Sequence, residues 1–142
     1  MNNKIFRLFV YGSLRSGFRH PAYQYLARYF RLLGEATVKG KLYDMGEYAA
    51  AVSTDEERFL QGELYEIIEP NEFDWAIAQL DDYEGLNVEA GEKPMYNRQP
   101  VQSFLNGESG DTWIYWFNGE TEGNPEVISG DVMQYLQQKS KQ

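Results

Sequence analysis

The chain has 142 residues, of which 13 are basic and 22 are acidic, so its formal net charge at pH 7 is −9. This length suits one domain with its own core, and we expect residues 1–142 to form a single domain. An acidic surface repels phosphate backbones, which argues against nucleic acid as a partner. The sequence contains no cysteine, which excludes disulfides, thiolate ligands for a metal and a cysteine nucleophile.

No apolar run in the chain is long enough to form the core of a signal peptide or to span a bilayer. The lack of cysteine also suits a reducing compartment. We therefore expect a cytoplasmic protein that has no membrane partner. The sequence leaves the oligomeric state open.

The first half of the chain predicts three strands and one helix. Residues 5–11 form a mainly apolar run that is typical of a buried strand. A proline suits the first turn of a helix over 21–33, where apolar residues recur at helical spacing and after which Gly34 is a stop signal. Residues 35–45 and 59–68 alternate in character and are rich in β-branched or aromatic residues, which predicts two further strands.

The second half predicts a longer helix, a strand pair and a short last helix. Asn71 is the expected cap of a helix over 72–85, which Gly85 would end. The remaining predicted elements are strands over 96–106 and 112–118, joined near 107–111, and a helix over 128–139 capped by Ser129. Because strands and helices do not alternate regularly, we expect a mixed α+β domain built on a bent sheet or a small barrel.

The segment LFVYGSLRSG, residues 8–17, ends the first predicted strand in a turn that is poor in bulky side chains. Gly12 and Gly17 have the spacing of a P-loop. The lysine and the hydroxyl residue that complete a P-loop are replaced by phenylalanine and arginine, which excludes nucleotide hydrolysis. The hydrolase pattern G-x-S-x-G is also not matched, and a single histidine, His20, gives little support for a serine triad.

A simpler role for this turn is the binding of an anion. Consecutive backbone N–H groups in a tight turn can point into one concavity and hold an anion. Gly12 lets the main chain approach a ligand closely, and Ser13 adds a hydroxyl group. The turn could therefore bind a carboxylate, or it could be a strand-ending turn that has no ligand.

Three carboxylates, Asp81, Asp82 and Glu84, crowd the end of the predicted helix over 72–85. They face the negative end of the helix dipole, which a fold selected for stability alone would avoid. Crowding and burial raise the proton affinity of such groups, and Glu84 is our candidate for a general acid/base. The alternatives are a solvated acidic cap and a Mg²⁺ or Ca²⁺ site, although no EF-hand spacing is present and we expect no metal site.

A basic residue follows in the segment MYNRQP. Arg98 is two residues beyond Tyr96, so both side chains lie on the same face of the predicted strand. Arg98 could pair with the acidic cluster or hold a ligand's carboxylate. We expect the structural pairing.

Seven motifs occur in an order that resembles a known family. They are YGSLRSG, GKLYDMGEYAAAV, QGELYEI, LDDYEG, YNRQPV, TWIYWF and ISGDV. Together they resemble the γ-glutamylcyclotransferase-like superfamily, most closely its bacterial AIG2-like branch, over nearly the whole chain. The resemblance implies a small, mixed, barrel-like β-sheet with flanking helices. It also implies an enzyme of transferase or lyase type that releases 5-oxoproline from a small γ-glutamyl amine or peptide and needs no cofactor.

The resemblance also implies roles for individual residues. In the family, the turn after the first strand binds the glutamyl group and one glutamate is the acid/base. Carried over to this sequence, the acid/base role falls to Glu84, and substrate binding falls to Tyr11, Gly12, Ser13, Leu14 and Tyr115. The substrate's own α-amine would attack the γ-carbonyl, with Glu84 moving the proton.

The sequence departs from the family pattern at two positions. Val132 stands where many members have tryptophan, and Ala49 replaces a usual proline; we expect both to alter packing rather than chemistry. Two other functions stay open, a non-catalytic module that kept the pocket for a small ligand and a protein-interaction domain. The leaving amine is also open.

Overall fold

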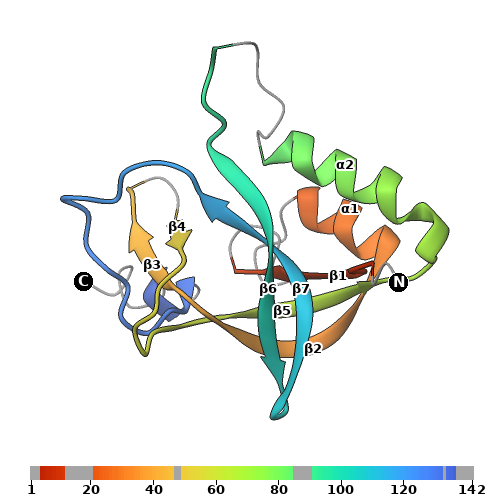
Figure 1. Cartoon of the computed structure of the whole chain (residues 1–142), viewed down its shortest axis with the longest axis horizontal. Coiled ribbons are helices and arrows are strands. Elements are labelled where there is room, and N and C mark those ends of the chain that lie inside the picture. Colours follow the sequence, from red (N-terminus) through yellow and green to blue (C-terminus); the bar gives the residue numbers. More distant parts are fainter. Residues whose placement is uncertain (1–3, 12–20, 47–48, 85–90, 133, 137–142) are drawn as a thin grey trace.

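The computed structural model describes residues 4–11, 21–46, 49–84, 91–132 and 134–136. Five strands form a closed barrel in the order β1-β5-β2-β6-β7, and β3 and β4 pair in a separate small sheet (Figure 1). The barrel strands are β1 Arg7–Val10, β2 Phe30–Lys39, β5 Phe59–Ile67, β6 Tyr96–Leu105 and β7 Glu108–Phe117. The other elements are α1 Pro21–Tyr29, β3 Lys41–Asp44, β4 Ala49–Val52, the 3-10 turn η2 Pro70–Glu72 and α2 Phe73–Tyr83. This α+β barrel with flanking helices confirms the predicted fold class.

Strand β1 closes the barrel because both of its edges are paired. On one side it runs antiparallel to β5, with Phe9 opposite Leu64. On the other side it runs parallel to β7, with Leu8 opposite Trp113. The pairing leaves β1 without a free edge. It also holds Tyr11, the residue after β1, beside the carboxyl-terminal half of β7, where the candidate site lies.

Two apolar cores lie on opposite faces of the strands, because successive side chains of a strand point to opposite faces. Leu8 and Val10 pack beneath the helices, which lie side by side against one flank of the barrel (Figure 1). Phe9 and Tyr11 belong to the second core, with strand residues of the barrel and of β3 and β4. The helices contribute to the first core the residues Leu26, Phe73, Ala76, Ile77 and Leu80. No helix in the described part of the chain has the length and apolar character needed to cross a membrane.

The helix predicted over 21–33 ends earlier than expected. Helix α1 stops at Tyr29, and the residues after it begin β2. Phe30 pairs with Ile67 of β5, so strand pairing prevails over the helical spacing of the apolar residues. Gly34, the expected stop signal, lies inside β2 next to an irregularity in its pairing with β5.

The strand predicted over 35–45 is divided between two sheets. Its first part belongs to β2 of the barrel, and its last part is β3, which leaves the barrel to pair with β4. Gly40 lies at the division, where an added Cβ would come within 3.0 Å of Leu60 and 3.1 Å of Trp116. Strand β4 was not predicted, because its sequence AAAV has three alanines and gives a weak β signal.

Helix α2 begins one residue later than predicted, with Glu72 rather than Asn71 at its cap position. Asn71 lies within the 3-10 turn η2, and α2 starts at Phe73 with no side-chain hydrogen bond at its cap. At the other end, α2 stops at Tyr83, and Gly85, the expected terminator, lies outside the described residues.

The predicted strand pair is a hairpin whose turn lies earlier than expected. Asn106 and Gly107 have φ angles of 52° and 83°, which suit a tight two-residue turn. Strand β7 therefore already begins at Glu108.

Near the end of the chain, Asp131 rather than Ser129 caps a helical turn, because its Oδ1 accepts the N–H of Gln134 at 3.2 Å.

Candidate active site

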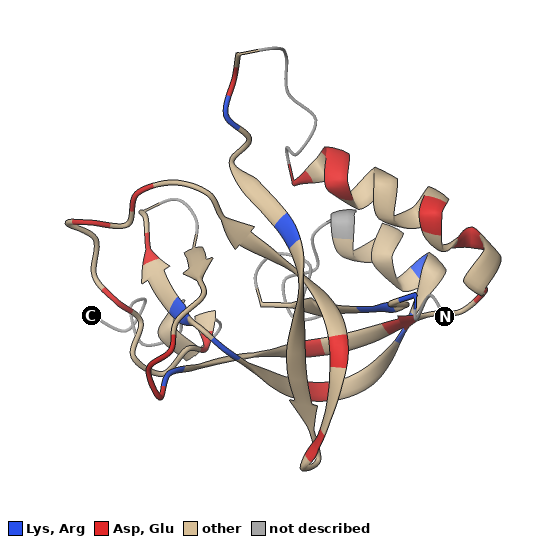
Figure 2. Cartoon of the chain, viewed as in Figure 1, with Lys and Arg blue, Asp and Glu red and all other residues tan. Residues whose placement is uncertain are grey.

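The end of α2 is fixed against the barrel, and this fixes the direction of its carboxylates. Ile77 and Leu80 are buried in the core beneath the helices. Asp81 and Glu84 are three residues apart, which places them on the same side of a helix. The N–H of Glu84 donates to the carbonyl of Leu80 at 2.9 Å, so the helical geometry extends to Glu84. Figure 2 shows acidic residues toward both ends of α2, which has no basic residue.

Arg98 of β6 forms a two-point ion pair with Asp81. Its Nε donates to Oδ1 at 2.7 Å and its Nη2 donates to Oδ2 at 3.0 Å. Both side chains are mostly buried, with 20% of Arg98 and 15% of Asp81 exposed. A guanidinium that binds both oxygens of a carboxylate fixes its orientation as well as its charge. The expected pairing of Arg98 with the acidic cluster is confirmed.

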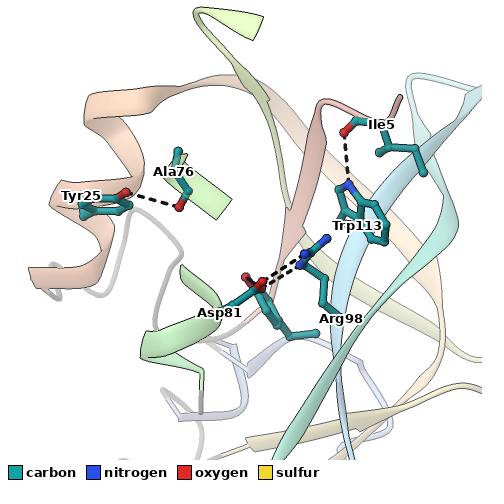
Figure 3. A network of polar contacts seen from close by, with 7 residues as sticks. Ile5, Tyr25, Ala76, Asp81, Arg98 and Trp113 are labelled. Carbon is teal, nitrogen blue, oxygen red and sulfur yellow. Dashed lines mark hydrogen bonds and ion pairs between the residues drawn. The ribbon is translucent and has the colours of Figure 1, made fainter. Parts of the chain in front are cut away.

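The ring of Trp113 packs against the guanidinium of Arg98. The Cζ of Arg98 lies 4.4 Å from the centre of the Trp113 ring, close enough for a cation–π contact. The indole Nε1 of Trp113 donates to the carbonyl of Ile5 at 3.1 Å, which holds the ring in place (Figure 3). This support was not predicted. The available signal is that Trp113 lies two residues before Tyr115 and therefore on the same face of β7.

Tyr115 connects the acidic end of α2 to Tyr11, the residue after β1. Its hydroxyl donates to Asp81 Oδ1 at 2.8 Å. Its carbonyl accepts the hydroxyl of Tyr11 at 2.6 Å. Burial, and then the charge of Asp81, raise the pKa of Tyr115, so its hydroxyl keeps its proton. Burial, and then the nearby Tyr96 and Glu84, raise the pKa of Tyr11 in the same way.

Glu84 is the titratable group of this site that changes its charge near neutral pH. Its side chain is partly buried. Burial, and then the negative charge of Asp81, raise the pKa of Glu84 to about 7. Its charge in turn raises the pKa of Tyr11 and of Tyr115. A carboxyl group with such a pKa can both accept and donate a proton at neutral pH.

Only some of the other predicted site residues lie in the part of the chain that the structure describes. Gly12, Ser13 and Leu14 lie outside the described residues, so anion binding by this turn stays a prediction. Tyr11, the residue before them, is held beside β7 by its hydrogen bond to the Tyr115 carbonyl, and the charge of Glu84 raises its pKa. In the part of the chain that the structure describes, no three His, Asp or Glu side chains are grouped as metal ligands would be.

Tyr96 borders the same neighbourhood. Its ring meets Phe117 edge-on at a centroid distance of 5.8 Å, and its hydroxyl donates to the carbonyl of Ala49 at 3.4 Å. Its effect on the pKa of Tyr11 places the two hydroxyl groups near each other. Tyr96 therefore links the start of β4 to the site.

One known protein family matches most of the chain. Residues 8–134 match the family described as "Gamma-glutamyl cyclotransferase, AIG2-like". The chain belongs to this AIG2-like γ-glutamyl cyclotransferase family. The predicted resemblance is thereby confirmed. Glu84 and Tyr11, which the structure brings together, both lie within the matched residues.

Solved structures from bacteria and from mammals share this family's fold with the chain. Protein YkqA from Bacillus subtilis is 25% identical with a TM-score of 0.71, over 98% of this chain and 44% of YkqA. Protein ytfP from Escherichia coli is 28% identical with a TM-score of 0.60, over 91% of this chain and 97% of ytfP. An AIG2-like protein from Mus musculus is 21% identical with a TM-score of 0.64, over 91% of this chain and 90% of that chain. The chain thus spans less than half of YkqA. No curated protein matches the sequence.

Proposed function

We propose that this member of the AIG2-like family is a γ-glutamylcyclotransferase that releases 5-oxoproline from a small γ-glutamyl amine or peptide. The observation that carries the proposal is Glu84, a partly buried carboxyl group whose pKa of about 7 suits proton transfer in both directions. It lies beside Tyr11, the residue that leads into the glycine turn. The reaction is the one that the family's description names.

The reaction needs a proton carrier more than it needs a protein nucleophile. The α-ammonium of the substrate loses a proton to the Glu84 carboxylate, and the free amine attacks the γ-carbonyl carbon. A new C–N bond closes the five-membered lactam, and the C–N bond to the leaving amine breaks as Glu84 returns its proton to that nitrogen. The ring nitrogen releases one proton to solvent and the leaving amine takes one up, so no water or cofactor is consumed.

Two physical effects supply the rate in this mechanism. Holding the γ-glutamyl chain folded for intramolecular attack is worth about 7–11 kcal/mol when the orientation is good. General acid–base transfer adds about 10²–10⁴-fold. In the proposal, backbone N–H groups of the turn at Gly12 to Leu14 hold the α-carboxylate or polarise the γ-carbonyl, and the tyrosine hydroxyls keep their protons and stay neutral.

The direct test is release of 5-oxoproline from a panel of γ-glutamyl amino acids, γ-glutamyl amines, γ-glutamyl-lysine and glutathione, followed by mass spectrometry. We expect product from at least one compound. The matched control is the same compound with its α-amine acetylated, which cannot cyclise and should give neither 5-oxoproline nor free amine. Release of amine from the acetylated compound would mean hydrolysis. Binding of these compounds without product from any of them would mean a non-catalytic module.

A further inference from the structure

The two carboxylates that share one side of the α2 end have different surroundings. Asp81 accepts three hydrogen bonds, two from Arg98 and one from the Tyr115 hydroxyl. No described residue donates a hydrogen bond to the Glu84 carboxylate. The structure therefore fixes the orientation of the Asp81 carboxylate through three donors.

We propose that Asp81 is a positioning residue, a carboxylate that Arg98 and Tyr115 hold on the Glu84 side of the α2 end, where it controls how readily Glu84 exchanges a proton. The inference rests on the proposed function, since it concerns the acid/base of that reaction. It adds a role for the Asp81–Arg98–Tyr115 network, which would otherwise only attach α2 to the barrel.

The need for Arg98 follows from how paired carboxylates titrate. Two carboxylates that share a site compete for one proton, and their transitions then belong to the pair. A guanidinium keeps its charge at every relevant pH, and here it binds both oxygens of Asp81. The proton is therefore directed to Glu84. Environments that separate two acids in this way give them separate roles.

Every charged or titratable group known to act on Glu84 fits this assignment. Asp81 acts from the same helix and raises the pKa of Glu84. From the barrel, Tyr11 follows β1 and Tyr115 belongs to β7, and both stay neutral. Arg98 of β6 reaches Asp81 and neutralises part of its charge. Removal of the Asp81 carboxylate takes away its repulsion of the Glu84 carboxylate. It also leaves the positive charge of Arg98 unneutralised, and both effects favour the ionised form of Glu84.

The sharpest experiment is a carboxyl-carbon NMR titration of the whole protein, in which Glu84→Gln assigns the Glu84 signal. We expect Asp81→Asn to lower the Glu84 midpoint by roughly one pH unit or more. The matched control is Asp82→Asn, which removes an exposed carboxylate from the same turn and should move the midpoint by less than about half a unit, because solvent screens it. The acid limb of kcat/KM should move with the NMR midpoint.

A second variant keeps the test decisive if Asp81→Asn alone fails to fold. Asp81→Asn leaves a mostly buried guanidinium without its partner, whereas Asp81→Asn combined with Arg98→Gln removes both charges. We expect the double variant to titrate between the wild type and the single variant.

An unchanged Glu84 midpoint in these variants would overturn the proposal. Loss of activity at an unchanged midpoint would mean a purely structural role. Because the titration needs no turnover, its result is independent of the substrate panel. A shifted midpoint with no 5-oxoproline from any compound would reject the proposed reaction and keep the electrostatic assignment.

Discussion

Replacing Glu84 by glutamine is expected to lower kcat for 5-oxoproline release by about 10²–10⁴-fold, the usual contribution of a general acid/base. Glutamine keeps the size of the side chain but can neither take the proton of the α-ammonium nor return it to the leaving amine. The backbone N–H of Glu84, which closes the last turn of α2, is unaffected. KM should change little, since binding of the glutamyl group is assigned to the turn at 12–14.

The matched control is Asp82→Asn, two residues earlier on the same helix end and exposed to solvent. It removes one negative charge, as Glu84→Gln does, and should leave kcat within about twofold, because exposed charges are screened. Thermal unfolding of both variants should resemble that of the wild type. A folded Glu84→Gln protein with kcat within threefold of wild type would remove Glu84 from the chemistry.

The largest expected effect on stability is that of Arg98→Met. The change keeps the apolar stem and removes the guanidinium, which leaves Asp81 mostly buried without its ion-pair partner. Loss of one partner from a buried pair costs about 3–5 kcal/mol, and because a fifth of Arg98 is exposed we expect about 3 kcal/mol. The cation–π contact with Trp113 is lost as well. Urea unfolding measures the change in the free energy of unfolding.

An exposed ion pair in the same barrel provides the comparison. Arg31 lies 2.6 Å from Glu66, but 64% of its side chain is exposed, and Arg7 also binds Glu66. Arg31→Met should therefore cost less than about 1 kcal/mol. Equal losses for Arg98→Met and Arg31→Met would contradict the claim that burial makes the Asp81 pair the stronger one.

The sequence predicted best those strands whose pattern of apolar residues matches their burial in the barrel. Strand β5, expected over 59–68 and found at Phe59–Ile67, has neighbours on both edges and buried residues on both faces. The predicted end of α1 was wrong because the apolar residues after Tyr29 fit a helix as well as a strand. Only their pairing with β5 decides between the two. Strand β4 gave no usable signal, since alanine favours helices more than strands.

The candidate site was predictable in part. The crowding of Asp81 beside Glu84 was predictable from their spacing on a helix. The shared face of Tyr96 and Arg98 was predictable from the two-residue period of a strand. The link from Tyr11 to Asp81 through Tyr115 was not, because it depends on how β1 and β7 align across the closed barrel. Local sequence does not encode such a register between strands more than 100 positions apart.

The proposed mechanism requires Glu84 to exchange a proton near neutral pH in the chemical step. The decisive measurement is kcat/KM for 5-oxoproline release between pH 4 and pH 9, which reports the ionisations of the free enzyme and the free substrate. Because the reaction begins with the carboxylate form and the pKa of Glu84 is about 7, the rate should rise with pH through a transition centred near 7. A profile with no transition between pH 6 and pH 8 would contradict the account.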